Sequence, residues 1–283
     1  MSKSKYNVAL IVHACDGYEF LYEGFEHFFS KYWDFKIPCD YYFATEEKEV
    51  NISGFENIRS GKGAWSDRLA YLLKNKIEAD YILYFQEDMW LSKPVNRIFF
   101  EQLFELVSDK GWKQVKLHSS DVYKTIATDM FIEGFNVAEI DNRQSDFLMS
   151  HQVTLWQKDF LLAQLHKKEH PWRNERRGTK RLKKLNPQIF HIDYFAENGC
   201  TEININQQPK NRGEYHAVSF NSTLNFNVVE YIKLLNKGKT ELKKYAAELQ
   251  HHYDNNLTHG GKAKPKKEDI FKKFKNWFLK KKG

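Results

Sequence analysis

Two adjacent carboxylates, Glu87 and Asp88, are the residues whose type and position most directly indicate chemistry in this chain. They follow the apolar and aromatic run Tyr81–Phe85, which is typical of a short strand buried on both faces. In open α/β sheets, ligands bind at the edge where the strands end, so both acids are expected at that edge. Carboxylate oxygens bind Mg2+ and Mn2+, and these ions also bind substrate phosphates. We therefore predict a metal–diphosphate site at Glu87 and Asp88; the alternative is that they cap the next turn or pair with a neighbouring Lys.

A second candidate segment is 59–69, where two glycines and several cations come before an amphipathic helix. Apolar residues at i, i+4, i+7 and i+8 from Trp65 support that helix. Its first turn would present free N–H groups beside Arg59, Lys62 and Arg68, which together could cradle a diphosphate. The spacing is not that of a Walker motif. The alternative is a glycine turn with solvated charges.

Three further side chains each allow a functional and a structural interpretation. Asp16 follows the first predicted strand, and it could accept hydrogen bonds from a base or ribose or cap the following helix. Glu175 lies near an aromatic residue, which can raise the pKa of a glutamate enough for general-base catalysis; otherwise it is a surface acid paired with Arg. His216 is a candidate third metal ligand only if the fold returns it to Asp88, because a single His is more often structural.

Length and composition are consistent with one large α/β domain, alone or with appendages, since the chain has 283 residues and is 41% apolar. Cys15, Cys39 and Cys200 are odd in number and widely spaced, which favours reduced thiols in a cytosolic protein. The first apolar run, 8–12, is expected to be a strand and not a signal peptide. No run approaches the roughly 20 apolar residues of a membrane-spanning helix.

The net charge of +7 is concentrated at the C-terminal end of the chain. From Lys262 onward ten Lys oppose two acids, a net +8, which leaves about −1 for the rest, so no nucleic-acid-binding surface is expected. In segment 268–283, aromatic residues at helical spacing alternate with Lys, a pattern typical of a basic amphipathic helix on an anionic membrane surface. The alternative is a helix docked on the protein core or on a partner.

The remaining pattern predicts an alternation of strands and helices that opens as β-α-β, which favours a parallel pair. The expected strands are 6–12, 39–44, 81–85, 114–117, 147–156 and 190–194. The expected helices are 19–32, one from Trp65, one from about 96 to 110, 158–169, one from Pro171, and two within 227–250 that separate near 237–239. Segment 125–143 is expected to be a variable loop or a hairpin, and 255–265 a polar linker.

Four segments, in this order and spacing, resemble bacterial GT-A-type glycosyltransferases of surface-polysaccharide assembly. They are Gly63-Ala64-Trp65-Ser66-Asp67-Arg68-Leu69, the run from Tyr81 to Trp90, Ser150-His151-Gln152 with Leu155-Trp156-Gln157-Lys158-Asp159-Phe160-Leu161, and Pro171-Trp172-Arg173-Asn174-Glu175. The resemblance covers roughly residues 6–219. It implies a GT-A-like, Rossmann-type mixed sheet flanked by helices, with a C-terminal helical extension. Gln86 replaces the first acid of the usual Asp-x-Asp motif, which makes Asp88 the better-placed ligand.

The resemblance also implies roles for individual residues. The donor-binding candidates are His13, Asp16, Arg59, Lys62, Trp65, Arg68 and Glu87. The candidate ligands of Mn2+ or Mg2+ are Asp88, Glu87 and His216. The catalytic candidates are Glu175, as base, and Asp88. The acceptor-binding candidates are His151, Gln152 and Trp172. The expected domains are a catalytic domain at 1–225, a helical extension at 226–254, a linker at 255–267 and a basic tail helix at 268–283, of which the last three lie outside the resemblance.

The expected function is transfer of a sugar from a nucleotide-sugar donor to a glycan or lipid-linked acceptor, in cell-surface polysaccharide synthesis. The leaving diphosphate must be neutralised, here by the metal ion with Lys62 or the two arginines. An inverting reaction, which we favour, needs a base such as Glu175, whereas a retaining one does not. A cytoplasmic enzyme peripheral on the inner face of the cell membrane is expected. The alternatives are a sugar-phosphate nucleotidyltransferase and a non-enzymatic membrane-binding scaffold.

Overall fold

A computed structural model describes residues 6–197 and 212–264 of the chain. The chain divides into two compact units, Met1–Val218 and Ser219–Gly283. The predicted tail helix, 268–283, lies outside the described residues. Within them, no helix is long and apolar enough to cross a membrane.

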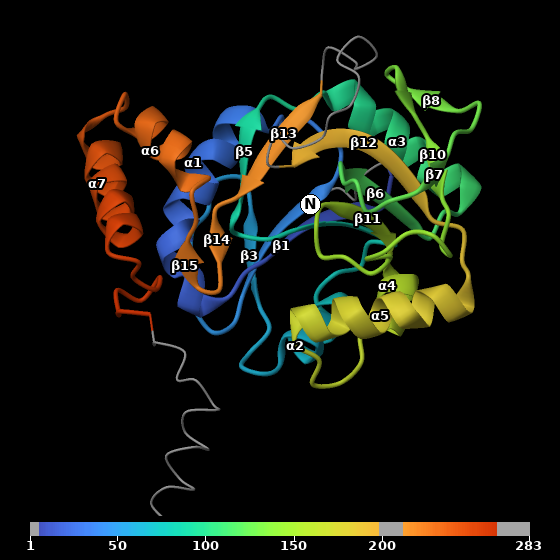
Figure 1. Ribbon diagram of the computed structural model, residues 1–283, viewed down its shortest axis with the longest axis horizontal. Helices are drawn as coiled ribbons and strands as arrows, with labels where there is room; N and C mark the ends of the chain where they lie inside the picture. The colour runs from blue at the N-terminus through green and yellow to red at the C-terminus, as the bar shows by residue number, and fades with distance from the viewer. Residues whose placement is uncertain (1–5, 198–211, 265–283) are drawn as a thin grey trace, which may run out of the picture. The chain divides into compact units, whose positions relative to one another are not determined.

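The first half of the first unit alternates strands and helices (Figure 1). Its elements are β1 (Val8–His13), η1 (Asp16–Leu21), α1 (Tyr22–Tyr32), β2 (Asp40–Thr45), β3 (Glu56–Arg59), α2 (Trp65–Asn75), β4 (Tyr81–Phe85), β5 (Met89–Lys93) and α3 (Arg97–Lys110). The start of α3 follows from its cap, because the Asn96 side chain accepts from the backbone N–H groups of Ile98 and Phe99.

The second half of this unit is less regular and contains short strands. Its elements are β6 (Gln114–His118), β7 (Thr125–Ile126), β8 (Phe131–Ile132), β9 (Phe135–Asn136), β10 (Ala138–Ile140), β11 (Thr154–Gln157), α4 (Lys158–Gln164), α5 (Pro171–Leu185), β12 (Phe190–Glu197) and β13 (Gly213–Ala217). The predicted variable segment 125–143 therefore contains four short strands, of which β8 and β9 form a hairpin.

The main sheet has the order β3-β2-β1-β4-β11-β6-β12-β10-β7, and β13 pairs with both β12 and β5. β1 is parallel to β2 and β4, and β2 is parallel to β3, which gives the 3-2-1-4 order of a Rossmann-type half. β11 is antiparallel to β4 and β6, so the sheet is mixed. β1 to β4, β6 and β12 thus end at one common edge, where β11 begins. The predicted α/β class, with a mixed sheet flanked by helices, is confirmed.

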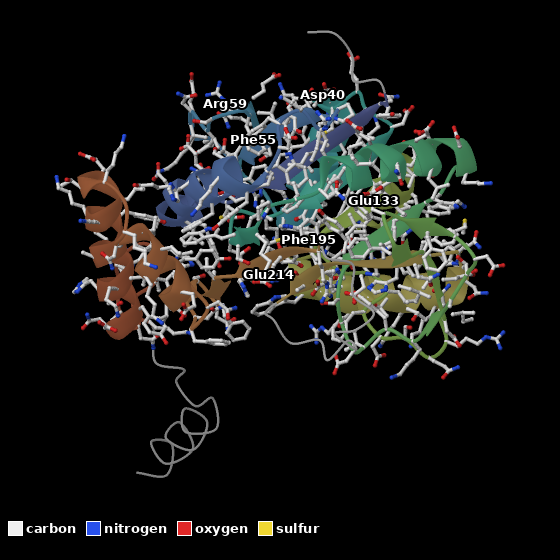
Figure 2. The ribbon with its side chains drawn as sticks, turned by 90° about the horizontal axis from the view of Figure 1, so that it is seen from above. Asp40, Phe55, Arg59, Glu133, Phe195 and Glu214 are labelled. Carbon is white, nitrogen blue, oxygen red and sulfur yellow. The ribbon has the colours of Figure 1, made fainter. Side chains whose placement is uncertain are left out.

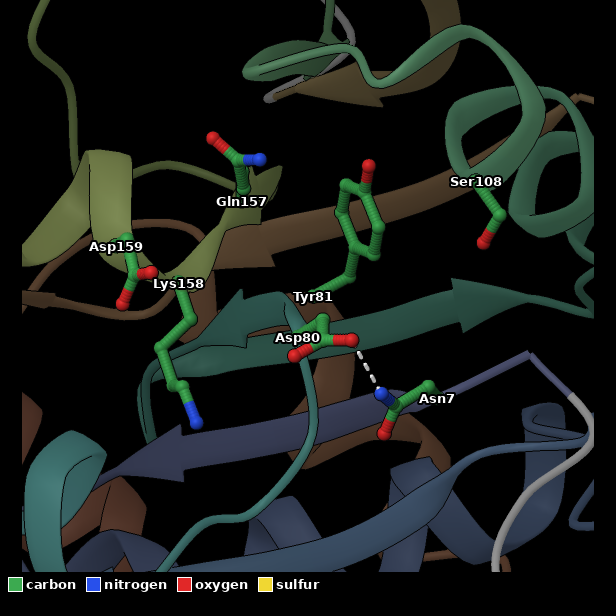
Figure 3. A pocket seen from close by; sticks show the side chains of 7 residues that line it. All are labelled: Asn7, Asp80, Tyr81, Ser108, Gln157, Lys158 and Asp159. Atoms are coloured by element: carbon green, nitrogen blue, oxygen red, sulfur yellow. Dashed lines mark hydrogen bonds between the residues drawn. The ribbon is translucent and has the colours of Figure 1, made fainter.

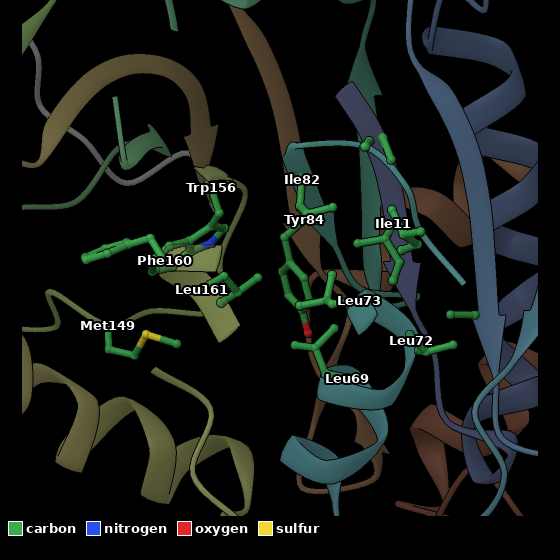
Figure 4. Close-up of a cluster of buried hydrophobic side chains, with 14 of the residues drawn as sticks. Ile11, Leu69, Leu72, Leu73, Ile82, Tyr84, Met149, Trp156, Phe160 and Leu161 are labelled. Carbon is green, nitrogen blue, oxygen red and sulfur yellow. The ribbon is translucent and has the colours of Figure 1, made fainter. Parts of the chain in front are cut away.

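Helices cover both faces of this sheet (Figure 1). On one face, α2 packs leucines against Ile11, Ile82 and Tyr84 of β1 and β4, with Trp156 and Phe160 beside them (Figure 4). On the other face, α1 and α3 contribute an aromatic layer, in which the ring centroids of Phe29 and Phe85 are 5.8 Å apart. Both faces of β4 are therefore buried, as its uninterrupted apolar run predicts.

The second unit contains a small hairpin and two helices. Its elements are β14 (Ser219–Phe220), β15 (Thr223–Leu224), α6 (Val228–Leu235) and α7 (Thr240–Asp254). The two helices separate at the predicted break near residues 237–239. Residues of the expected linker form isolated bridges, Thr223 with Thr258 and Leu257 with Ala263. The segment after α7 is therefore folded back on β15 as far as the structure describes it. The proposed domain limits at 225, 254 and 267 remain predictions.

Several predicted elements differ from the observed ones. The expected strand 147–156 is a strand only in β11, because 147–153 is irregular. The expected helix 158–169 ends at Gln164. Strands β3 and β5 have no counterpart in the prediction.

Candidate active site

Glu87 lies in the turn that follows β4, and its contacts connect the ends of two neighbouring strands. Its Oε1 atom accepts a hydrogen bond from the backbone N–H of Cys15, just beyond β1, at 3.2 Å. Its backbone carbonyl accepts from the indole Nε1 of Trp90 at 3.1 Å, and Trp90 is fully buried. The turn that places both acids at the carboxyl edge is therefore fixed by a packed tryptophan.

The carboxylates of Glu87 and Asp88 are close enough to disturb each other's ionisation. Burial, and then the charge of Asp88, raise the pKa of Glu87, which is 5% exposed. Burial also raises the pKa of Asp88. Two adjacent carboxylates that ionise reluctantly are a pair whose charge a divalent cation would compensate. The residues present therefore fit Mg2+ or Mn2+, which proteins often bind through one or two carboxylates together with substrate phosphates.

The third predicted ligand, His216, is engaged elsewhere. Its Nε2 atom is hydrogen-bonded to Glu214 Oε1 at 3.1 Å, and Glu214 in turn accepts from the Ser92 hydroxyl at 2.7 Å. β13 does return to the site, since the Val218 N–H donates to the Asp88 carbonyl at 2.9 Å. Over residues 6–197 and 212–264, however, no group of three or more His, Cys, Asp or Glu side chains is arranged to hold a metal ion. The predicted set of Glu87, Asp88 and His216 is not assembled there.

A buried group of rings lies beside the carboxylate pair. His13, the last residue of β1, is 3.4 Å from the Tyr84 hydroxyl through Nδ1, and its ring lies 5.6 Å from that of Trp65. The Trp65 ring lies 4.2 Å from the ring of His151. Burial, and then the charge of Arg68, hold the pKa of His13 well below its usual value, so the ring is neutral at pH 7. Its Nε2 atom is buried without a hydrogen-bond partner among the described residues, as expected beside a ligand or water.

Glu175 reaches this group from α5. Its Oε1 atom accepts a hydrogen bond from the backbone N–H of His151 at 2.9 Å. Helix α5 approaches closely because Gly178 faces Met149: a Cβ at Gly178 would lie 2.6 Å from Met149 Cγ. Burial raises the pKa of Glu175, although the His151 N–H and the Lys116 charge oppose this rise. Glu175 is therefore a partly buried carboxylate at the sheet edge, and the alternative of a surface acid paired with Arg is not found within the described part of the chain.

Asp16 and Arg68 organise the rim next to β1. Arg68 is buried, and its Nη1 atom contacts the Ala14 carbonyl at 3.3 Å and Glu46 Oε1 at 3.4 Å. The Asp16 carboxylate accepts three backbone N–H bonds from residues 46–48, at 2.9 to 3.1 Å. Burial raises its pKa, but these three bonds lower it more, and the net shift is downward. Asp16 therefore holds the loop after β2 and does not cap the helix that follows.

Arg59 and Lys62 lie on the same rim but remain exposed. Arg59, at the end of β3, is labelled in Figure 2. It is 3.7 Å from Glu49, and Lys62 is 2.8 Å from Glu47. Exposed ion pairs contribute only about 0–1 kcal/mol. Replacing Glu49 and Glu47 by the diphosphate of a ligand, as partners of Arg59 and Lys62, would therefore cost little free energy.

The predicted acceptor-binding residues are not all in one place. His151 lies against Trp65, and the Gln152 Oε1 atom accepts from the Tyr215 hydroxyl at 2.7 Å. Trp172 is 52% exposed at the start of α5, with its ring 5.4 Å from that of His170. The structure thus places His151 and Gln152 at the sheet edge and Trp172 on the outer surface.

Sequence reasoning missed the buried polar residues at the end of β6. Lys116 is fully buried, and its Nζ atom donates to the Phe147 carbonyl at 3.1 Å. His118 Nε2 lies 2.8 Å from the Tyr123 hydroxyl. The sequence signal that could have identified Lys116 is a charged residue inside an otherwise apolar strand. Glu46, the partner of Arg68, was also missed, although it directly follows a strand end.

One cavity lies away from this site (Figure 3). It has a volume of about 290 Å³ and is found at the amino ends of β1 and β4, where Asn7 donates to Asp80. Because it is at the opposite edge of the sheet, it is not part of the candidate active site.

Comparison with known proteins does not identify a family. No protein-family model matches the chain, and no curated protein matches it. Among solved structures it is similar to the crystal structure of S. aureus TarS 1–349, with 9% identity, a TM-score of 0.44, and 87% of this chain and 71% of that chain covered. The structure of S. aureus TarS 1–349 in complex with UDP has 10% identity and a TM-score of 0.45, with 86% of this chain and 70% of that chain covered. A further S. aureus TarS structure has 10% identity and a TM-score of 0.44, with 87% of this chain and 43% of that chain covered. Similarities at this level assign no activity to the chain.

Proposed function

We propose that this protein is a glycosyltransferase that transfers a sugar from a nucleotide-sugar donor to a glycan or lipid-linked acceptor. The observation that carries the proposal is the position of Glu87 and Asp88. They follow β4 at the carboxyl edge of a Rossmann-type half, and Glu87 is bonded to the end of β1. This edge is where such sheets bind nucleotides. Glu175 reaches the same edge through His151.

The donor diphosphate would lie along the rim formed by the ends of β1, β3 and β4. Glu87 and Asp88 would hold Mn2+ or Mg2+, which supplies positive charge to the departing diphosphate when it is bound. Lys62 and Arg59, exposed on the same rim, would add positive charge there. Arg68, already bonded to Glu46 and Ala14, would position the β1 end.

Glu175 would act as the general base of an inverting reaction. The acceptor hydroxyl loses its proton to the Glu175 carboxylate, while its oxygen forms the new bond to the sugar C1. The bond from C1 to the diphosphate oxygen breaks at the same time, and its electron pair leaves with the nucleoside diphosphate. A glutamate whose pKa is raised by burial is well matched to this proton transfer. His151 and Gln152 would line the acceptor side.

The finer role that we propose is cell-surface polysaccharide synthesis by a cytoplasmic enzyme held at the inner face of the membrane. The support is the lysine-rich, aromatic sequence of segment 268–283. The contribution of this segment can be measured by comparing the membrane association of the full chain with that of a chain lacking 268–283. Equal association of the two chains would contradict the proposed role of the segment.

The test of the proposed reaction is product analysis. The purified protein is incubated with a panel of sugar nucleotides, with Mn2+, with Mg2+ and with EDTA. Release of a nucleoside diphosphate from one donor class is expected. Formation of pyrophosphate from a nucleoside triphosphate and a sugar phosphate would instead identify a nucleotidyltransferase. The alternative of a non-enzymatic scaffold requires that no sugar nucleotide binds.

A further inference from the structure

Helix α5 has two faces of opposite character. Its inner face is buried through Asn174, Gly178 and Leu182, which pack toward the sheet. Its outer face carries six cations, and the only acid in the helix, Glu175, points inward. The cations are Arg173, Arg176, Arg177, Lys180, Lys183 and Lys184, whereas Arg181 turns inward to Glu169 and the Gln164 carbonyl. We call this outer surface the α5 cationic face.

Few of these charges are neutralised within the described residues. Arg177 is 3.9 Å from Glu169, which also binds Arg181, and Lys183 is 3.6 Å from Asp146. The remaining cations have no carboxylate within ion-pair distance in that part of the chain, and Arg173, Arg176 and Lys180 are exposed. A surface with so large an excess of one charge is suited to an extended anionic partner.

The α5 cationic face also includes a shallow cavity. Arg173, Arg176, Arg177 and Lys180 line one shallow cavity of about 440 Å³. These positions recur at i, i+3, i+4 and i+7, so they form one stripe along the helix. The helix has 15 residues and is therefore about 22 Å long, which exceeds the reach of a single phosphate group.

One exposed aromatic side chain borders the cationic face. Trp172, in the first turn of the helix, is 52% exposed. It lies four residues before Arg176, so it is next to that cation at the edge of the cationic stripe. Trp at the boundary between water and lipid, with Lys and Arg beside it, is characteristic of surfaces that bind in the headgroup region of a membrane.

We propose that the α5 cationic face docks the first unit on an anionic lipid surface, through lipid phosphate groups. This contact is separate from segment 268–283, and it does not depend on the proposed transferase activity. A soluble polyanion would use the cations but would gain nothing from the burial of Trp172. The exposed Trp172 beside the cations is therefore the reason to favour a membrane.

The experiment is vesicle co-sedimentation of the full chain, with phosphatidylglycerol–phosphatidylcholine vesicles and with phosphatidylcholine alone. The test variant combines Arg173→Gln, Arg176→Gln and Lys180→Gln, which removes three charges without breaking an observed ion pair. The matched control combines Lys237→Gln, Lys243→Gln and Lys244→Gln in the second unit, all exposed. Both variants must keep the thermal midpoint of the unmodified protein. Inorganic polyphosphate is the soluble probe, and Trp172→Gln tests the exposed aromatic side chain.

For anionic vesicles, we expect the α5 variant to lose about fivefold in partition for each cation removed, and the control variant to lose less than threefold. Trp172→Gln should weaken vesicle binding and leave polyphosphate binding unchanged. Equal loss in the α5 and control variants would show that only net charge matters, and unchanged binding of the α5 variant would remove the face from membrane contact. If Trp172→Gln had no effect while polyphosphate bound through the same arginines, the partner would be a soluble polyanion and the proposal would be wrong.

Discussion

The Oε1 atom of Glu175 accepts a hydrogen bond from the backbone N–H of His151 at 2.9 Å. This bond connects α5 to the irregular segment before β11, across 24 residues of sequence. It places a partly buried carboxylate at the edge where β1 and β4 also end. The segment needs no strand pairing at this point, because Glu175 satisfies the N–H group that a ladder would otherwise use.

Replacement of Glu175 by Gln should lower turnover about 10²- to 10⁴-fold, since the amide keeps the size of the side chain but removes the general base. The affinity for the donor should change by less than twofold. Steady-state kinetics with the preferred donor measures both quantities. Glu105→Gln, on the exposed side of α3, is the matched control. An unchanged rate in the Glu175 variant would exclude it as the base.

Replacement of Asp88 by Asn should stabilise the metal-free protein while abolishing turnover. The ionised pair at Glu87 and Asp88 is unfavourable in the folded state, because burial raises both pKa values. With one charge removed, the thermal midpoint in EDTA at pH 7.5 should rise by about 2–4 °C for each kcal/mol gained. Scanning calorimetry measures it, with Asp109→Asn as the surface control. A lower midpoint would show that Asp88 is structural.

Buried Lys116 should make stability depend on pH. Burial lowers its pKa to about 7, although the Glu175 carboxylate opposes this shift, whereas in the unfolded chain its pKa is near 10.5. Between these values the unfolded chain binds more protons, so the free energy of unfolding rises with pH by on the order of 1 kcal/mol per unit.

Urea unfolding of the protein and of Lys116→Met at pH 7, 8 and 9 isolates this contribution, because the other titrating groups cancel in the difference. The stability of the unmodified protein relative to the variant should increase over this range. A difference that stays constant with pH would mean that Lys116 keeps its charge when folded.

Gly24 of α1 should tolerate no side chain, because an added Cβ would lie 2.1 Å from Cζ2 of Trp90. Trp90 also donates to the Glu87 carbonyl, so its displacement should disturb the turn that holds both acids. Gly24→Ala should cost about 1–3 kcal/mol of unfolding free energy, as overpacked cores do. Gly17→Ala is the control, since its nearest neighbour is the Cys15 Sγ atom at 3.8 Å. Equal stability of the two variants, by urea unfolding, would contradict this packing.

The elements that the sequence predicts well have local signals. β4 is an unbroken apolar run, and α3 begins at an Asn cap and ends before Gly111 in the left-handed region. The segment 147–153 misled the prediction because Leu148, Met149 and Val153 are buried in an irregular chain. Met149 packs against Gly178 of α5, which is distant in sequence, so periodicity could not separate this segment from a strand.

In the candidate site too, some features follow from local sequence signals and others depend on contacts distant in sequence. The edge position of Glu87 and Asp88 follows from the strand before them, and the structure confirms that position. β5 was missed because two acids suggest a chain leaving the sheet, whereas the turn at 86–89 returns it to pair with β13. The partners of Arg68 and Asp16 lie 22 to 54 residues away along the chain, and all of them except Ala14 are in the loop after β2. No local pattern encodes contacts of that kind.

The most direct measurement is titration calorimetry of nucleoside diphosphates, with and without Mn2+, on the unmodified protein and on Asp88→Asn. We expect one nucleoside diphosphate to bind the unmodified protein at least tenfold more tightly with Mn2+, and Asp88→Asn to lose that gain. If binding were equally tight with and without the ion in both proteins, Glu87 and Asp88 would not be holding a cation against a diphosphate.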